Sequence, residues 1–448
     1  SVQHDELSVR YGEGYTAKYF RIKKGHDRYW RVASGGFGIH RPVVAKKGLM
    51  VNAEVSHFDL NEWIDFIVGF YSHTSSSHTK SSAGYGLLQY LEPHWFSLKA
   101  NTFDAFGLRG RQVIAEGSRQ NGNWEIDALS DILDGHITYI ENNHDYPHGF
   151  LGARLKYFDL PFAAIQSNGQ KTGTNAMYHG ALPSMNIETA NLGLFDRHQL
   201  GHAKLQAESI VLPKGNEWII KKLMISNKDA FFSANGKWVA LPGMVPMTKL
   251  DFQLETSNEG GLFKRLLLDG FLKDGVGVHK GSIRWHGLPF VPDFSSLSGK
   301  LSINLTNGEF QSVKPGATKL LSILSLKSIP RRIGFDLRDI VSEGFAYDSI
   351  SGDFDIVDGV IRTDNLKVMG LAAEISMNGL INMVDMTQDM KAVVVPEINA
   401  AGASIAVGVL NPMIGAGTLL AQVLARSPLM QKFTLQYHIT GSWENPLV

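Results

Sequence analysis

The residues with the clearest potential for metal chemistry are histidines and aspartates at short spacings. His198 and His202 stand four residues apart, but Gly201 disfavours the helix that would bring the two rings together, and the glutamate of the zinc-protease motif is absent. Residues 353–364 hold four aspartates and one Asp-Gly pair, but they lack the bidentate glutamate of a calcium loop and favour a hairpin instead. Because the chain also has no Cys, thiolate ligands are excluded. We therefore predict neither a metal ion nor a cofactor.

Motifs of nucleophilic and phosphate chemistry are missing as well. Residues 12–17 imitate the glycine loop of dinucleotide-binding proteins, but no helical pattern or ribose-binding acid follows them, so we expect a β-turn. The sequence has no G-x-S-x-G elbow and no P-loop. Its 16 His residues are scattered without a compelling acidic partner nearby in sequence, although carboxylates can still meet across strands. These observations predict that the protein is not an enzyme.

Composition narrows the class of protein further. The chain has 448 residues, with 43 Lys and Arg against 43 Asp and Glu. This balance argues against a nucleic-acid-binding protein, which needs a basic surface to neutralise phosphates. With 44% hydrophobic residues, the chain can bury a large apolar surface. It begins at Ser1 without a Met or a signal peptide, which favours a processed form or a fragment whose N-terminal anchor lies outside it.

The elements that carry these residues are mostly strands. Apolar and polar residues alternate in many segments, which marks strands with one apolar and one polar face; examples are residues 251–254, 300–306, 374–377 and 434–439. Asn-Gly or Asp-Gly pairs begin at nine positions and favour tight hairpins: 121, 134, 168, 235, 269, 274, 307, 358 and 378. Helical patterns are confined to residues 259–268, residues 316–326 and the stretch after Ala400. The fold class is therefore mainly β, an elongated, twisted antiparallel sheet with a few short helices near the C-terminus.

Three tryptophans indicate a repeat. Trp30, Trp124 and Trp218 are each 94 residues apart, and each stands near the start of a strand pattern. A further strand pattern follows each of them roughly thirty residues later. This spacing predicts sets of strands that repeat and extend one long sheet, with each set contacting only its neighbours.

Two segments interrupt the strand pattern. Residues 71–86 are rich in Ser, Thr and His, and we expect a solvated insertion loop there, because His73 and His78 have no acidic partner near them. Residues 398–425 are 28 consecutive uncharged residues that Asn411-Pro412 breaks in the middle, so a pair of short apolar helices over 400–425 fits better than one long span. This helical pair could fill an apolar cavity, lie in a membrane surface or cross a membrane.

The order of the motifs toward the C-terminus resembles that of AsmA-like proteins. The resemblance rests on residues 297–310, the Pro315-Gly316 pair, the helical pattern 320–326, residues 333–337 and 344–354, and the final Gly-Ser-Trp-Glu-Asn-Pro at 441–446. It covers nearly the whole chain and is strongest from about residue 285 onward. It divides the chain into repeating β-groove segments over 1–296 and an AsmA-like C-terminal segment over 297–448.

The resemblance implies a fold, a location and a function. Such proteins form a repeating β-groove, an open trough rolled from one sheet, and an N-terminal helix outside this chain would anchor it in the inner membrane of a Gram-negative bacterium. They cross the periplasm toward the outer membrane and are associated with phospholipid transfer, not with catalysis. The implied partners are phospholipid acyl chains and, through residues 400–425, the outer membrane surface; no nucleic acid is implied.

Elementary physics agrees with a groove for lipid. At ~0.8 kcal/mol per methylene, moving a two-tailed lipid into water costs on the order of 20 kcal/mol, so a conduit needs an apolar lining. Alternating strands supply one with a single face, although alternation alone does not tell which face points inward. The expected lining positions are Phe96, Leu98, Ile187, Leu205, Phe252, Leu254, Leu301, Ile303, Leu305, Ile375, Met377, Leu435 and Tyr437.

Two alternatives to a lipid conduit stay open. One is a periplasmic β-scaffold that never touches lipid, and the other is an envelope protein that binds lipopolysaccharide or glycan through exposed Trp and Tyr. For the conduit, replacing Ile303 and Leu305 with Asp is expected to block lipid passage with little effect on folding.

Overall fold

The computed structural model describes most of the 448-residue chain as strands. The described residues are 2–25, 29–43, 47–60, 62, 90, 93–105, 108–160, 181–194, 198–266, 272–311, 345–371, 373–396, 434–443 and 446–447. The expected insertion loop 71–86, the helical pattern 316–326 and the apolar helical pair 400–425 lie outside them. The chain divides into two compact units, Ser1–Trp218 and Ile219–Val448. The mainly β class is confirmed, whereas the boundary at 296/297 stays a prediction.

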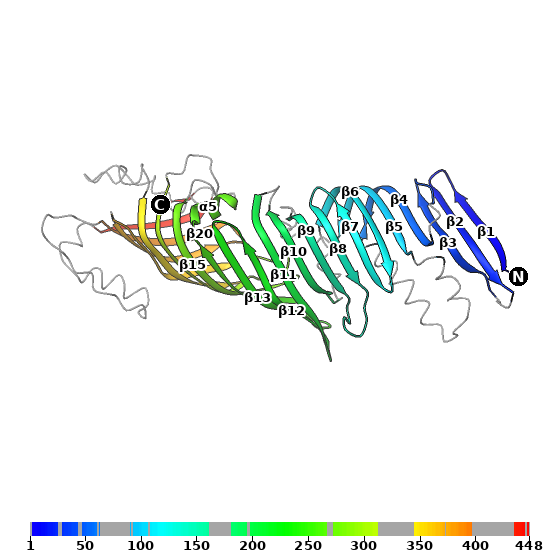
Figure 1. Cartoon of the computed structure of the whole chain (residues 1–448). Coiled ribbons are helices and arrows are strands. Elements are labelled where there is room, and N and C mark those ends of the chain that lie inside the picture. The colour runs from blue at the N-terminus through cyan, green and yellow to red at the C-terminus, as the bar shows by residue number, and fades with distance from the viewer. Residues whose placement is uncertain are drawn as a thin grey trace. The chain divides into compact units, whose positions relative to one another are not determined.

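In the first unit, each strand pairs with the next one along the chain (Figure 1). Three pairs are parallel, β3–β4, β4–β5 and β9–β10, so the antiparallel pairing predicted for the whole sheet does not hold there. Long connections, residues 60–94 and 161–183, precede β5 and β10 and allow the chain to return to the starting edge of the sheet. The strands are β1 (Val2–Tyr11), β2 (Tyr15–Lys24), β3 (Arg31–Ile39), β4 (Gly48–Asp59), β5 (Trp95–Ala105), β6 (Leu108–Gln120), β7 (Asn123–Leu129), β8 (Leu133–Ile140), β9 (Phe150–Leu160), β10 (Ser184–Leu194), β11 (His198–Leu212) and β12 (Gly215–Ser226), which spans the unit boundary.

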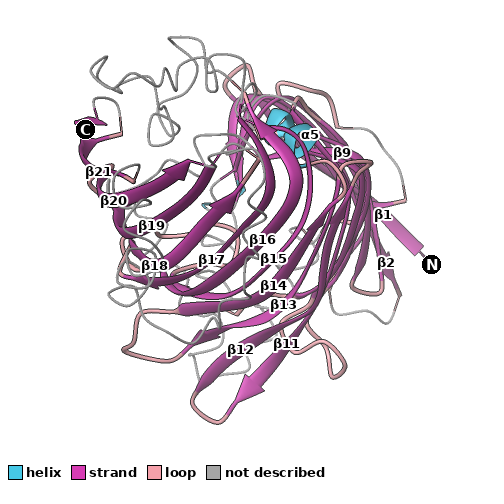
Figure 2. Cartoon of the chain, turned by 90° about the vertical axis from the view of Figure 1, so that its left-hand side faces the viewer, coloured by secondary structure: helices cyan, strands magenta, loops and turns pink. Residues whose placement is uncertain are grey.

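In the second unit, every pair of successive strands from β13 to β22 is antiparallel. Figure 2 shows these strands following one another around a curved sheet, and no pairing of the described residues joins β13 to β22, so the sheet is open. The elements are β13 (Ala230–Ala240), β14 (Met247–Thr256), α5 (Glu259–Arg265), β15 (Leu272–His286), β16 (Ser298–Phe310), β17 (Phe345–Val357), β18 (Val360–Met369), β19 (Ala373–Asn382), β20 (Thr387–Pro396), β21 (Leu435–Ser442) and β22 (Pro446–Leu447). The open, curved sheet confirms the fold class.

Some of the Asn-Gly and Asp-Gly pairs form the predicted tight turns, and others do not. Asn121-Gly122 joins β6 to β7 and Asp358-Gly359 joins β17 to β18, with positive φ at all four residues. Five other pairs lie inside strands, so the hairpin prediction is wrong there: Asp134-Gly135 in β8, Asn235-Gly236 in β13, Asp274-Gly275 in β15, Asn307-Gly308 in β16 and Asn378-Gly379 in β19. In β13 the reason is close backbone approach: a Cβ on Gly236 would lie 2.1 Å from the Lys249 carbonyl oxygen.

The helical pattern predicted at 259–268 is confirmed as α5. The side chain of Asn258 caps this helix by accepting a hydrogen bond of 2.8 Å from the Gly261 N–H. At the other end, Arg265 forms an ion pair of 2.8 Å with the buried carboxylate of Asp229, before β13. Phe263 packs against the apolar core of the sheet. Among the described residues, no helix combines the length and the apolar content that crossing a bilayer requires.

Candidate functional site

In the second unit, strand register places all the predicted lining residues on one face. Residues opposite each other in a strand pair project to the same side of the sheet. Ile303 of β16 lies opposite His279 of β15 and Gly352 of β17, and the two-residue period extends this face along each strand. Following the pairs from β14 to β21 collects Phe252, Leu254, Leu301, Ile303, Leu305, Ile375, Met377, Leu435 and Tyr437. We call this side the apolar face of the unit.

In the first unit, one ladder of paired residues crosses seven strands from β5 to β11. Its members are Phe96, Gly117, Ile126, Ile137, Ala153, Ile187 and Leu205. Leu98 comes two residues after Phe96 and lies opposite Ala115 on the same side. The four predicted lining residues of this unit therefore also share one apolar face.

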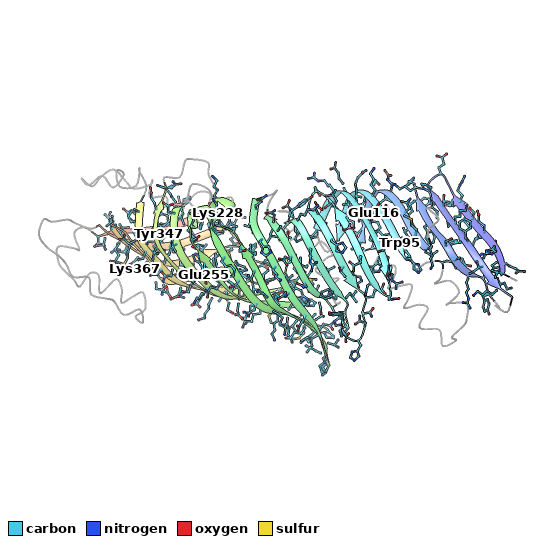
Figure 3. The ribbon with its side chains drawn as sticks, in the orientation of Figure 1. Trp95, Glu116, Lys228, Glu255, Tyr347 and Lys367 are labelled. Atoms are coloured by element: carbon cyan, nitrogen blue, oxygen red, sulfur yellow. The ribbon has the colours of Figure 1, made fainter. Side chains whose placement is uncertain are left out.

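The opposite face of each sheet is polar. Lys300 of β16 forms an ion pair of 3.2 Å with Asp355 of β17 in the second unit. Lys99 of β5 lies 3.3 Å from Glu54 of β4 in the first unit. Among the residues labelled in Figure 3, the charged side chains of Glu116, Glu255 and Lys367 lie on this polar face. The alternation seen in the sequence thus corresponds to two chemically different sides of each sheet.

The apolar face is densely packed in some places and open in others. Four of the thirteen predicted residues are buried, namely Leu98, Leu305, Ile375 and Met377, and the other nine are half-buried. In the second unit, buried members of this face form one cluster that extends from Leu272 of β15 to Ile439 of β21. The half-buried positions leave apolar surface uncovered, and a hydrocarbon chain could cover it.

A hollow of about 960 Å³ lies against the strands β12 to β17 of the second unit. Among the strands that line it, three each contribute an apolar residue between two polar ones: Phe252, Leu301 and Phe354. Phe252 stacks near Phe232, with ring centroids 5.9 Å apart, and its ring covers Gly281 of the next strand. Because Gly281 has no side chain, the ring can lie flat against the sheet beside the hollow.

Three polar side chains interrupt the apolar face beneath α5, and the sequence pattern did not reveal them. Glu259 is buried, and its carboxylate lies 3.3 Å from the His279 imidazole. Tyr347 is also buried, and its hydroxyl has no hydrogen-bond partner among the described residues. Burial, together with the nearby charges of Glu259 and Asp274, raises the pKa of Tyr347 to about 12. Glu259 belongs to a helix and His279 to a strand, so no local motif links them.

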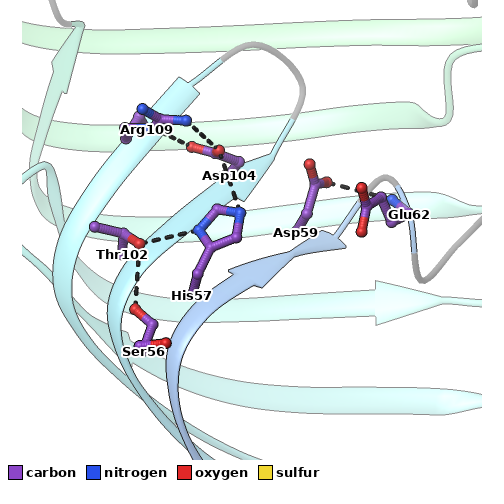
Figure 4. Close-up of polar contacts among 7 residues, drawn as sticks. All are labelled: Ser56, His57, Asp59, Glu62, Thr102, Asp104 and Arg109. Atoms are coloured by element: carbon purple, nitrogen blue, oxygen red, sulfur yellow. Dashed lines mark hydrogen bonds and ion pairs between the residues drawn. The ribbon is translucent and has the colours of Figure 1, made fainter.

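A second polar cluster lies where β4 and β5 end (Figure 4). His57, Asp59 and Asp104 offer three ligand atoms within 4.8 Å of one another. Asp104, however, accepts two hydrogen bonds of 2.6 Å from Arg109, and this guanidinium lowers the pKa of the carboxyl group. The hydroxyl of Thr102 lies 2.9 Å from Nδ1 of His57. Since arginine already neutralises the carboxylate, the cluster fits an ion-pair network better than a cation site.

Cross-strand pairing gives several histidines the acidic partners that the sequence did not show. The His136 ring lies 2.9 Å from Asp127 and 2.7 Å from Glu125, and these hydrogen bonds, that of Asp127 first, raise the pKa of the imidazole. His202, from the metal-like pair, lies 2.9 Å from Glu188. The partners are 9 to 14 residues apart in sequence, so they meet only through strand register. All these pairs lie on the polar face.

Two comparisons with known proteins find a similarity in sequence. The family model described as YhdP protein matches residues 1–448. The intermembrane phospholipid transporter YhdP of Escherichia coli (strain K12) is 38% identical over 243 residues, which are 54% of this chain and 19% of that protein. The match therefore spans about a fifth of the length of that relative. No solved structure matches the chain.

Proposed function

Because this chain belongs to the YhdP family, we propose that its apolar face binds the acyl chains of phospholipids and conducts them between the inner and outer membranes. The C-terminal motifs resemble those of AsmA-like proteins, and among these most specifically those of YhdP. Membership of the YhdP family confirms this resemblance. The E. coli relative is described as an intermembrane phospholipid transporter. In this chain, the observation that supports the same role is that all thirteen expected lining residues fall on one face of their unit.

The physical basis of the proposal is the barrier that water presents to acyl chains. Exposing two tails costs on the order of 20 kcal/mol, so a lipid must keep apolar contact along its whole route. A curved sheet brings the side chains of its concave face together, and the apolar side chains are those that pack with one another. Acyl chains would lie along this face, and the headgroups would stay at the open seam, in water.

The setting that follows from the proposal is the periplasm of a Gram-negative bacterium. The inner-membrane anchor would lie outside this chain, and residues 400–425 are the proposed contact with the outer membrane. The lining needs no catalytic group and no cofactor, because transfer along an apolar face breaks no covalent bond.

Co-purified lipid distinguishes the conduit from a scaffold. Native mass spectrometry of the protein purified without detergent should show bound phospholipid, released only when the sheet unfolds. A protein that is free of lipid after gentle extraction, and that takes none up from added vesicles, would contradict the proposal and favour a scaffold.

A pair of adjacent substitutions tests the lining directly. Ile303→Asp places a charge on the apolar face, whereas Ser302→Asp places the same charge on the exposed, polar face one residue away. We expect Ile303→Asp to abolish lipid transfer between vesicles and Ser302→Asp to leave it unchanged. Leu305→Asp is not suitable, because Leu305 is 5% exposed within the apolar cluster. We therefore no longer expect Leu305→Asp to leave folding intact, because burying its charge would destabilise the second unit.

The glycan-binding alternative requires exposed Trp or Tyr rings. Trp218, Trp238 and Trp285 are all buried. The indole N–H of Trp218 donates to the Pro183 carbonyl, and that of Trp285 donates to the Leu288 carbonyl. These three indole rings are not available to stack on sugars. Tyr11, Tyr15 and Tyr29 of the first unit are exposed, so the alternative stays open there.

A further inference from the structure

The two edges of the second unit carry different connections. Because successive strands are antiparallel, alternate connections fall on opposite edges of the sheet. One edge carries the long segments 257–271, 311–344 and 397–434. The other carries the connection 443–445 and four short turns, residues 241–246, 287–297, 358–359 and 383–386. We call these four turns, with the strand residues next to them, the short-turn rim.

Large apolar side chains project into solvent along the whole short-turn rim. Met244 and Val245 are 62% and 67% exposed in the first turn, and Val357 and Met386 are 62% and 58% exposed at the third and fourth. Phe290 in the second turn and Val384 in the fourth are exposed as well. Single exposed apolar residues need no explanation, but a row that continues through four successive turns indicates a contact surface.

The short-turn rim is held together by backbone hydrogen bonds between its turns. The Gly287 N–H donates to the Pro246 carbonyl at 2.8 Å, joining the first two turns. The Gly359 N–H donates to the Leu297 carbonyl at 2.9 Å, and the Met383 N–H donates to the Gly359 carbonyl at 3.0 Å. The exposed side chains are therefore carried by a connected backbone, which lowers the entropy lost when they bind.

The charged residues of the short-turn rim indicate which kind of lipid surface it fits. Its four turns contain no Lys or Arg and three acids, Asp293, Asp358 and Asp385. Each carboxylate already accepts a hydrogen bond from a neighbouring side chain: Asp293 from Ser296, Asp358 from Ser298 and Asp385 from Asn382. Apolar tips on turns without Lys or Arg suit the interfacial zone of a zwitterionic bilayer, whereas an anionic bilayer attracts basic residues.

We propose that the short-turn rim docks on the surface of a zwitterionic lipid bilayer. Met244, Val245, Phe290 and Met386 enter the interfacial zone, and the internally bonded carboxylates remain in the headgroup layer. Docking along this rim would turn one edge of the open sheet toward the lipids. Binding of the rim does not depend on transport along the apolar face, so the two are measured separately.

Flotation with vesicles of pure phosphatidylcholine tests the docking, using the full chain. The test variant carries Val245→Asp and Met386→Asp, two exposed positions where a charge is tolerated by the fold. The control is Leu371→Asp, because Leu371 is 74% exposed in the β18–β19 turn on the opposite edge. We expect the wild type and the control to float with the vesicles. The double variant should bind at least about tenfold more weakly.

The salt dependence and the lipid charge complete the test. Binding that persists in 0.5 M salt supports an apolar contact, since an electrostatic one would be screened. Three outcomes of flotation would overturn the proposal: no binding to phosphatidylcholine, unchanged binding of the double variant, or binding only to phosphatidylglycerol vesicles. A double variant that still floats but no longer self-associates would also overturn it, because the short-turn rim would then contact a second copy of the chain and not a bilayer. Each leaves co-purified phospholipid, and therefore the proposed conduit, unaffected.

Discussion

At the scale of single residues, aromatic rings on the apolar face lie over glycines of neighbouring strands. A Cβ added to Gly117 would lie 2.4 Å from the Phe96 ring, and one added to Gly308 would lie 2.2 Å from the Tyr347 hydroxyl. These glycines make room for large rings to lie against the sheet, which gives a smooth apolar surface. Alternation in the sequence predicts which side a ring occupies, but the opposing glycine depends on register and could not be predicted.

Tyr347 gives a prediction about alkaline pH. Its pKa is raised from 10.0 to about 12, mainly by burial. Between these two values the unfolded chain loses the phenolic proton while the folded chain keeps it, so the folded state loses stability as pH rises through this window. Tyr347→Phe cannot ionise, and we expect its urea midpoint to fall less between pH 10 and 12 than that of the wild type.

The same substitution has a built-in control at neutral pH. The Tyr347 hydroxyl has no hydrogen-bond partner among the described residues, so its removal should change the midpoint little at pH 7. An equal loss of stability at pH 7 and at pH 11 would show that the hydroxyl acts through a contact and not through its ionisation.

At the scale of elements, the sequence predicted whether a segment is a strand or a helix better than it predicted how the strands are paired. Strands such as β16 and the helix α5 follow from period and capping residues, since both signals are local. The parallel pairs β3–β4, β4–β5 and β9–β10 could not be predicted, because the direction of a strand depends on where its connection returns the chain, whether that connection is long or, as between β3 and β4, only residues 40–47. The histidine–carboxylate pairs were missed for the same reason, since register brings them together.

Helix α5 provides a prediction in which packing opposes propensity. Replacing Gly260 by Ala would favour the isolated helix by about 1 kcal/mol. In the folded unit, however, the new Cβ would lie 2.7 Å from the Leu272 carbonyl oxygen. Because backbone cannot move aside cheaply, we expect Gly260→Ala to destabilise the second unit by about 1–3 kcal/mol, measured by urea unfolding.

Lys264→Ala is the matched control for the helix, because Lys264 lies in its last turn and is exposed. We expect that change to stay within about 0.5 kcal/mol of the wild type. A stabilised Gly260→Ala variant would mean that α5 can shift away from β15, and the close contact would then not limit the helix position.

At the scale of the whole molecule, one rule of position parity describes both units, with local shifts such as that in β17, where the buried positions change from Phe345 and Tyr347 to Ile350 and Gly352. In each unit the alternate residues of successive strands fall on a single apolar face, although the units differ in their parallel pairs. The sequence predicted these positions, and strand register places them on the same face of each unit. What it could not supply is the exposed row along one edge, because that row depends on how turns from distant parts of the chain meet.

This parity rule predicts where lipid will be found along the chain. A photoreactive amino acid at Ile187 or Leu301, each half-buried on the apolar face of its unit, should crosslink to phospholipid in cells. The same group at Asn186 or Ser302, each exposed one residue away on the polar face, should not. A conduit must keep acyl chains in contact throughout, so adducts in one unit alone would contradict conduction along the whole chain. Adducts at all four positions would show that lipid adheres to both faces of the sheet. Lipid that is held only on the apolar face would react at Ile187 and Leu301 and not at the residues next to them.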